Sequence, residues 1–211
     1  LSLYGTLSAG VPGTVEGMWQ AHKKYGSQSW KALLTPAITL AIKGFIVHPK
    51  LDEGIKSRIN SFENEGVKVN FASYFSHAKA GELFKQPELA ETLKRIADEG
   101  KNGFYQGKTA KIISEFMAKS GGIITEKDLA NYHATWRKPI EMQWREFDVI
   151  TAPPPSSGGI AVLQWLTMYD LVKKNSQISH NSPDYIHLLS EVGKRVFADR
   201  AEYLGDPDFY D

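Results

Sequence analysis

Apolar side chains in the first half of the chain recur every three or four residues, the spacing of one face of an α-helix. The segment Thr14–Tyr25 places Val15, Met18 and Trp19 on one such face, with Thr14 as the expected N-cap and Gly26 as the expected stop. The same pattern, each time closed by a glycine, predicts further helices within residues 48–66, 87–100 and 106–122. The first part of the chain is therefore predicted to be helical.

Pro36 interrupts an apolar pattern that starts at Trp30 and ends before Gly44. Proline lacks the backbone N–H that a helix interior needs, whereas it is well tolerated at the first helical position. We therefore predict two short helices that meet here, with Thr35 as the cap of the second.

Other segments of this part give weaker or shorter signals. Residues 67–86 have no clean period and are predicted to form a loop with a short strand or turn. Thr125 followed by Asp128 forms a capping box, which predicts a short helix. The expected core residues of the helices are Leu51, Ile55, Ile59, Phe62, Leu89, Leu93, Ile96, Ile112, Ile113, Phe116 and Met117.

Apolar residues alternate with polar ones on either side of Arg145–Glu146, which predicts a β-hairpin across residues 140–151. A helix from Gly159 to Lys174 follows, apolar nearly all round and therefore expected between layers. A last helix is predicted to end at Gly205, with Ser182 as its N-cap and Pro183 at its first position. Its expected apolar residues are Ile186, Leu189, Val196 and Phe197.

These elements predict a helix-rich α+β fold with a helical lobe at 1–136 and, at 137–211, a β-hairpin with two long helices. The 211 residues are 42% hydrophobic and 23% charged, which is typical of a globular protein. The net charge of +1 and the scattered lysines and arginines give no basic stripe for nucleic acid. Gln164 and Asp170 interrupt the most apolar run, so we expect no membrane span. The five tryptophans are expected in the core, and both ends look cut, as in a piece of a longer polypeptide.

The stretch APPPSSGG, from Ala152 to Gly159, joins the hairpin to the apolar helix. A nucleophilic serine here would need the G-x-S-x-G pattern, which is absent, and a base such as His180 or His187 that no motif places. A rigid corner that starts the helix is the favoured interpretation. A contact with a cleft or another subunit stays open for Ser156, Ser157, Gly158 and Gly159.

Metal and cofactor sites have no support in the pattern. The six histidines form no H-E-x-x-H motif, there is no cysteine for a thiolate site or nucleophile, and no phosphate loop occurs. The carboxylates around Arg200 lack calcium-loop spacing, and we interpret them as an ion-pair network with that arginine. Those carboxylates are Asp199, Glu202, Asp206 and Asp208. No cofactor and no metal is predicted.

Six segments, in this order, resemble the gamma-glutamyltransferase (gamma-glutamyl transpeptidase) family. They are GVPGTVEGMWQAHKKYG, LLTPAITLAIKGFIV, GKNGFYQGKTA, GGIITEKDLANY, APPPSSGGI and FADRAEYLGDPDF. The resemblance implies an N-terminal nucleophile hydrolase with an αββα sandwich, made as a zymogen that cuts itself into large and small subunits. It also implies a periplasmic or secreted enzyme of glutathione metabolism, which transfers the glutamyl group of a gamma-glutamyl amide to water, an amino acid or a peptide.

The nucleophile of that family is a threonine followed by Thr-His or Ser-His, and no threonine of this chain has that context. The resemblance therefore places no catalytic residue on these positions. It implies a part of the large subunit that is inactive alone, with the small subunit as its partner. Three alternatives stay open: an acylase of the same family, a stand-alone helical binding module, and a serine hydrolase that uses Ser156 or Ser157.

Overall fold

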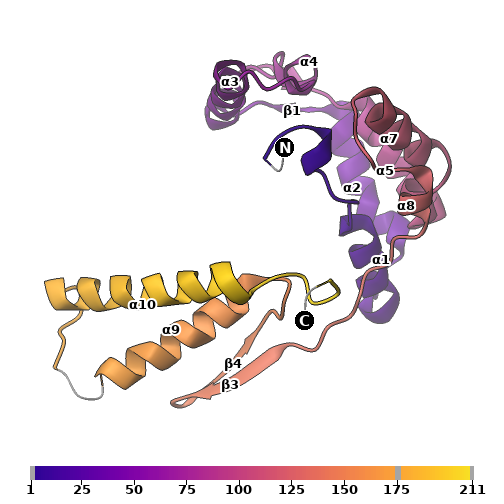
Figure 1. Ribbon diagram of the computed structural model, residues 1–211. Coiled ribbons are helices and arrows are strands. Elements are labelled where there is room, and N and C mark those ends of the chain that lie inside the picture. Colours follow the sequence, from indigo (N-terminus) through magenta and orange to yellow (C-terminus); the bar gives the residue numbers. More distant parts are fainter. Residues whose placement is uncertain (1–2, 174–176, 210–211) are drawn as a thin grey trace. The chain divides into compact units, whose positions relative to one another are not determined.

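The computed structural model describes residues 3–173 and 177–209, which fall into two compact units (Figure 1). The first unit ends at Thr135 and the second begins at Trp136. Each unit is described by itself.

Helices make up most of the first unit. They are η1 (Thr6–Ser8), α1 (Thr14–Tyr25), α2 (Trp30–Lys43), α3 (Pro49–Asn64), α4 (Phe71–Phe75), α5 (Pro87–Glu99), α6 (Asn102–Tyr105), α7 (Gly107–Lys119) and α8 (Glu126–Ala130). The strands β1 (Phe45–Ile46) and β2 (Leu83–Phe84) form an antiparallel pair, with Phe45 opposite Phe84. The predicted helices α1, α3, α5, α7 and α8 are confirmed, including the Thr125–Asp128 capping box, although Gly13 rather than Thr14 stands at the N-cap of α1. The short strand or turn expected within residues 67–86 is present as β2, whereas the short helices α4 and α6 were not predicted.

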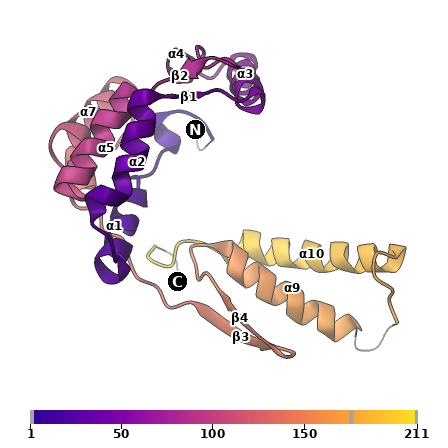
Figure 2. The ribbon, with the colours of Figure 1, turned by 180° about the vertical axis from the view of Figure 1, so that it is seen from behind.

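The prediction of two helices that meet at Pro36 is wrong, because α2 is continuous from Trp30 to Lys43. Ser29 caps it by accepting a hydrogen bond from the Ala32 N–H at 3.3 Å, and the Thr35 hydroxyl donates to the Lys31 carbonyl at 2.7 Å instead of capping a new helix. Helix α2 lies along α5 (Figure 2), where the Trp30 indole N–H donates to the Ile96 carbonyl at 2.8 Å. We infer that this packing outweighs the backbone bond lost at proline.

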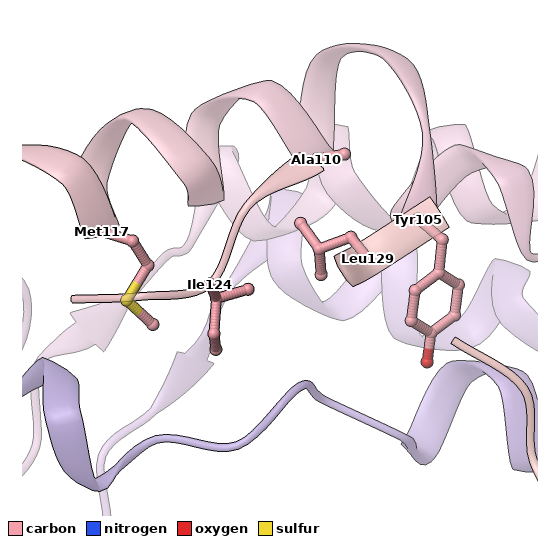
Figure 3. Packing of buried hydrophobic residues seen from close by; sticks show 5 residues of the cluster. All are labelled: Tyr105, Ala110, Met117, Ile124 and Leu129. Atoms are coloured by element: carbon pink, nitrogen blue, oxygen red, sulfur yellow. The ribbon is translucent and has the colours of Figure 1, made fainter. Parts of the chain in front are cut away.

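Two clusters of buried residues form much of the core of the first unit. One gathers Tyr105, Ala110, Met117, Ile124 and Leu129 along one side of α7 (Figure 3). The other joins Val47, Ile55, Ala78 and Phe84 around the β1–β2 pair.

The predicted core faces of α3, α5 and α7 are partly wrong. Ile55, Ile96 and Met117 are buried as expected, whereas four other expected core residues are exposed: Leu51, Leu89, Ile112 and Phe116. The buried stripes pass instead through small residues, such as Ala90 and Ala97 of α5 and Ala110 of α7. Small side chains let neighbouring helices approach closely, so they shift the buried face away from the largest apolar residues.

A carboxylate, Glu16, is fully buried in the first turn of α1. The Lys101 ammonium donates to its Oε1 at 3.2 Å and lies 3.1 Å from its Oε2, and Gln20 donates to Oε1 at 2.8 Å. The Tyr105 hydroxyl accepts from the Glu16 N–H at 3.2 Å and donates to the Pro12 carbonyl at 2.6 Å, and burial raises the pKa of this tyrosine. These bonds fasten the start of α1 to α6.

The second unit starts with the antiparallel strands β3 (Ile140–Trp144) and β4 (Phe147–Thr151), which confirms the predicted hairpin. Arg145 in its turn has a φ of 55°. Two antiparallel helices follow, α9 (Ser157–Lys173) and α10 (Pro183–Tyr203), and the predicted Ser182 cap accepts a hydrogen bond from the Tyr185 N–H at 3.2 Å. Helix α9 starts two residues earlier than predicted, and Lys174 lies outside the described residues.

The predicted core of α10 is also partly wrong. A third cluster of buried residues, in the second unit, consists of Leu188, Val192 and Val196 of α10. Ile186 and Phe197 are more than half exposed. Trp165 of α9 packs on Gly193 and against this cluster, so the side of α10 that carries Gly193 faces α9. Trp136 was expected in the core but is also exposed.

Within the described part of the chain, no helix combines the length and hydropathy that a membrane crossing requires.

Candidate functional site

The Pro153–Gly159 corner connects β4 to α9. Its turn is closed by a hydrogen bond from the Ser156 N–H to the Pro153 carbonyl at 3.2 Å. Ser156 and Gly158 face solvent, whereas Gly159 is buried. Of the two serines and two glycines, Gly159 is therefore the buried one and Ser157 is half-buried.

Ser157 is tied to the far end of α10. Its Oγ accepts a hydrogen bond from the Nε of Arg200 at 2.9 Å. A nucleophilic serine needs a base within hydrogen-bond reach, and in the described residues no histidine is hydrogen-bonded to Ser156 or Ser157. The arrangement suits a link between two elements of the fold and does not favour a serine nucleophile.

The two glycines differ in what surrounds them. A Cβ placed on Gly159 would lie 2.0 Å from the Ala152 carbonyl oxygen, so only glycine fits where α9 meets the end of β4. A Cβ on Gly158 would meet only the Ser156 Oγ, at the ordinary contact distance of 3.7 Å. Gly159 is required by the corner itself, and Gly158 is not.

The acidic residues near the chain's end bind a different arginine from the one predicted. Arg137, just before β3, holds Asp208 at 2.6 Å and lies 3.8 Å from Asp206. Arg200 binds Ser157 instead, and Asp199 accepts from Gln164 at 2.8 Å. Arg137 lies far from these carboxylates in the sequence, so no local pattern pointed to it. Over the described ranges, no three histidine or carboxylate side chains are grouped to hold a metal ion.

An apolar groove lies beside the hairpin tip and has a volume of about 480 Å³. We call it the α9 groove; its main lining residues are Trp144, Val162, Trp165, Tyr169, Tyr185 and Leu189. At its end Arg145 lies over the Trp144 ring, 4.4 Å from the centroid, and forms an ion pair with Asp170. The Arg145 guanidinium lowers the pKa of Asp170, so this pair is charged but internally neutralised.

Similarity to known proteins identifies the family of this chain. The family model described as gamma-glutamyltranspeptidase matches residues 1–211. The chain belongs to the gamma-glutamyltranspeptidase family. A curated relative, the glutathione hydrolase proenzyme of Pseudomonas aeruginosa, is 50% identical over 99% of this chain and 37% of its own length. The Escherichia coli glutathione hydrolase proenzyme is 39% identical over 99% of this chain and 36% of its own length.

Solved structures of the gamma-glutamyltranspeptidase family have the same fold. The gamma-glutamyltranspeptidase of Pseudomonas nitroreducens superposes with a TM-score of 0.91 at 49% identity, over 100% of this chain and 62% of that chain. The Helicobacter pylori enzyme gives a TM-score of 0.89 at 39% identity, over 100% and 61%. The chain is thus a helix-rich α+β segment of an N-terminal nucleophile hydrolase, as the sequence predicted. It spans about a third of the length of the curated relatives it matches, which fits a part of the large subunit.

Proposed function

We propose that the complete protein cleaves gamma-glutamyl amide bonds of glutathione-like donors and passes the glutamyl group to water or to an amino acid or peptide. The observation that carries this proposal is the 50% identity, over nearly the whole chain, to a glutathione hydrolase proenzyme. The 211 residues supply large-subunit scaffold, and the small subunit of the same precursor is their partner.

The reactive groups lie, in this proposal, outside these residues. No threonine here precedes Thr-His or Ser-His, and the one hydroxyl held at the corner, that of Ser157, is bound by Arg200. Attack on a gamma-glutamyl carbonyl needs a nucleophile with an adjacent base. The isolated chain is therefore inactive.

The test compares the complete precursor with residues 1–211 alone, using a gamma-glutamyl anilide and measuring the released aniline. We expect release by the processed complete protein, faster when a dipeptide acceptor is added, and none by the isolated chain. The matched control replaces the threonine at the new small-subunit N-terminus by alanine. Hydrolysis by residues 1–211, or no hydrolysis by the processed protein, would overturn the proposal.

A glutaryl amide in a parallel assay separates an acylase from a gamma-glutamyl enzyme, because it lacks the donor's α-amino group. We propose the gamma-glutamyl donor because the glutathione hydrolase of P. aeruginosa is 50% identical, against 34% for an acylase proenzyme of Pseudomonas sp.. Preference for the glutaryl amide would reverse this choice.

We also propose that the complete protein works in the periplasm or is secreted. The support is the family resemblance alone. Cell fractionation followed by an activity assay tests it, and activity confined to the cytoplasm would contradict it.

A further inference from the structure

Asn102 and Gly103 form the only Asn-Gly pair of the chain. Asparagine is chemically labile, and a following glycine has no side chain to shield its backbone nitrogen from the asparagine side chain. In the reaction open to such a pair, a bond forms between the Gly103 nitrogen and the Asn102 Cγ. The side-chain nitrogen takes up the Gly103 proton and leaves as ammonia. Water then opens the five-membered ring to give aspartate or, more often, isoaspartate, whose backbone runs through the former side chain.

The fold exposes one partner of this reaction and holds the other. Asn102, the first residue of α6, is exposed, whereas Gly103 is buried. The Gly103 N–H donates to the Gly100 carbonyl at 3.2 Å, and a Cβ on Gly103 would lie 2.1 Å from the Arg95 carbonyl oxygen. Helical side chains tilt toward the helix N-terminus, away from the following nitrogen. The attack therefore requires α6 to open.

Contacts of the residues that flank the pair keep α6 closed. A single turn without a side-chain cap has little stability of its own. The Lys101 ammonium lies 3.1 Å from the buried Glu16 carboxylate. The Tyr105 hydroxyl donates to the Pro12 carbonyl at 2.6 Å and accepts from the Glu16 N–H at 3.2 Å; its ring belongs to the cluster in Figure 3. The start of α1 thus holds both ends of α6.

We propose that Asn102 is a deamidation site that the contacts of Lys101 and Tyr105 with α1 protect, and that its isoaspartyl product releases the start of α1. Isoaspartate adds one backbone atom between Lys101 and Tyr105. Gly103 lies too close to the Arg95 carbonyl to absorb the extra length. The two flanking side chains then cannot both return to α1, so a transient opening of α6 becomes a permanent one.

Deamidation rates in the complete precursor test the protection. Peptide mass spectrometry follows the conversion of Asn102 at mildly alkaline pH, in the folded protein and in urea. We expect conversion at least about tenfold slower in the folded protein, because the reaction waits for local opening. Tyr105→Phe removes the hydroxyl that joins α6 to α1, so it should speed conversion in the folded protein about fivefold or more and leave the rate in urea unchanged. Tyr74→Phe is the matched control, because Tyr74 is 55% exposed, and it should change neither rate.

Amide hydrogen exchange at Glu16 tests the consequence, because this N–H donates to the Tyr105 hydroxyl. The isoaspartyl form, separated from the unmodified protein by chromatography, should exchange this amide at least about tenfold faster. Asn102→Asp carries the same new charge on a normal backbone and should exchange it nearly as slowly as the wild-type protein.

Equal conversion of Asn102 in the folded wild-type protein and in Tyr105→Phe would overturn the protection. No conversion in the folded protein, under conditions that convert the chain in urea, would overturn the site itself. Equal exchange at Glu16 with and without isoaspartate, or equally fast exchange in Asn102→Asp, would refute the release of α1 by the longer backbone. The exchange measurement uses the wild-type sequence, so it decides the proposal even if Tyr105→Phe fails to accumulate.

Discussion

Removing the ammonium that faces Glu16 should destabilise the first unit more than any exposed charge change. The Glu16 side chain is 0% exposed and that of Lys101 is 29% exposed. In Lys101→Met the carboxylate would stay buried, with the Gln20 amide as its remaining side-chain donor. Leaving a buried charge without its partner costs about 3–5 kcal/mol.

We expect the lower end of that range, about 3 kcal/mol, because solvent reaches part of the Lys101 side chain in the folded state. For a unit of this size this corresponds to a fall in Tm of about 10 °C. The double variant Glu16→Gln/Lys101→Met should recover part of the loss, because the uncompensated charge is then gone. This recovery separates the electrostatic cost from lost packing of the lysine stem.

Urea unfolding combined with amide hydrogen exchange measures the effect unit by unit. Exchange should accelerate in α1 and α6, while α10 in the second unit serves as an internal reference. Lys31→Met is the matched control, because its ion pair with Asp98 is 69% and 55% exposed and should contribute less than about 1 kcal/mol. If Lys101→Met costs no more than Lys31→Met, the reasoning from burial is wrong.

Three further predictions concern the backbone and one carboxylate. Gly159→Ala should lower the free energy of unfolding of the second unit by at least about 1–3 kcal/mol, because the new Cβ would lie 2.0 Å from the Ala152 carbonyl oxygen. Urea unfolding measures this effect, with Gly54→Ala as the control because its Cβ would have nothing within 4 Å. Equal unfolding midpoints for the two variants would refute the prediction. Pro36→Ala should stabilise the first unit by more than about 1 kcal/mol, since a proline inside a helix costs about 3 kcal/mol. Pro49→Ala at the start of α3 should change the free energy of unfolding little, and equal effects of the two variants in urea unfolding would contradict the prediction. Hydrogen bonds from the Ala80 N–H and then Lys56 lower the pKa of Asp52, so its stabilisation is complete above its ordinary value of 3.8 and is lost as the pH falls through the lower folded value. Exchange of the Ala80 amide, corrected for its intrinsic pH dependence, should therefore lose protection as the pH falls below the ordinary value of 3.8, and Asp52→Asn should remove this pH response.

Local signals in the sequence predicted most helices, because caps and stops are encoded within a few residues. Ser182 with Pro183, and Thr125 with Asp128, place helix starts where the structure has them. The short helices α4 and α6 were not predicted, because one helical turn is too short to show a hydrophobic period. The continuity of α2 through Pro36 depends on packing along α5, which is a tertiary effect.

The faces of the helices were harder to predict than their ends. Large apolar residues such as Ile186 and Phe197 were expected in the core, yet the buried residues are Leu188 and Val192, in the cluster against which Trp165 packs. At the corner, sequence reasoning identified Ser157 and Gly159 as candidates but not their partners. The bonds from Arg200 to Ser157 and from Arg137 to Asp208 join distant positions, and no spacing rule connects them.

The described core contains three separate clusters of buried residues, and their separation affects how the protein responds to damage. The clusters around Leu129, Val47 and Val196 share no residue. Substitutions in different clusters should therefore add nearly independently, and the helices around each cluster should open and close as their own cooperative group. Proteases would then cleave locally opened forms of the chain before it unfolds completely.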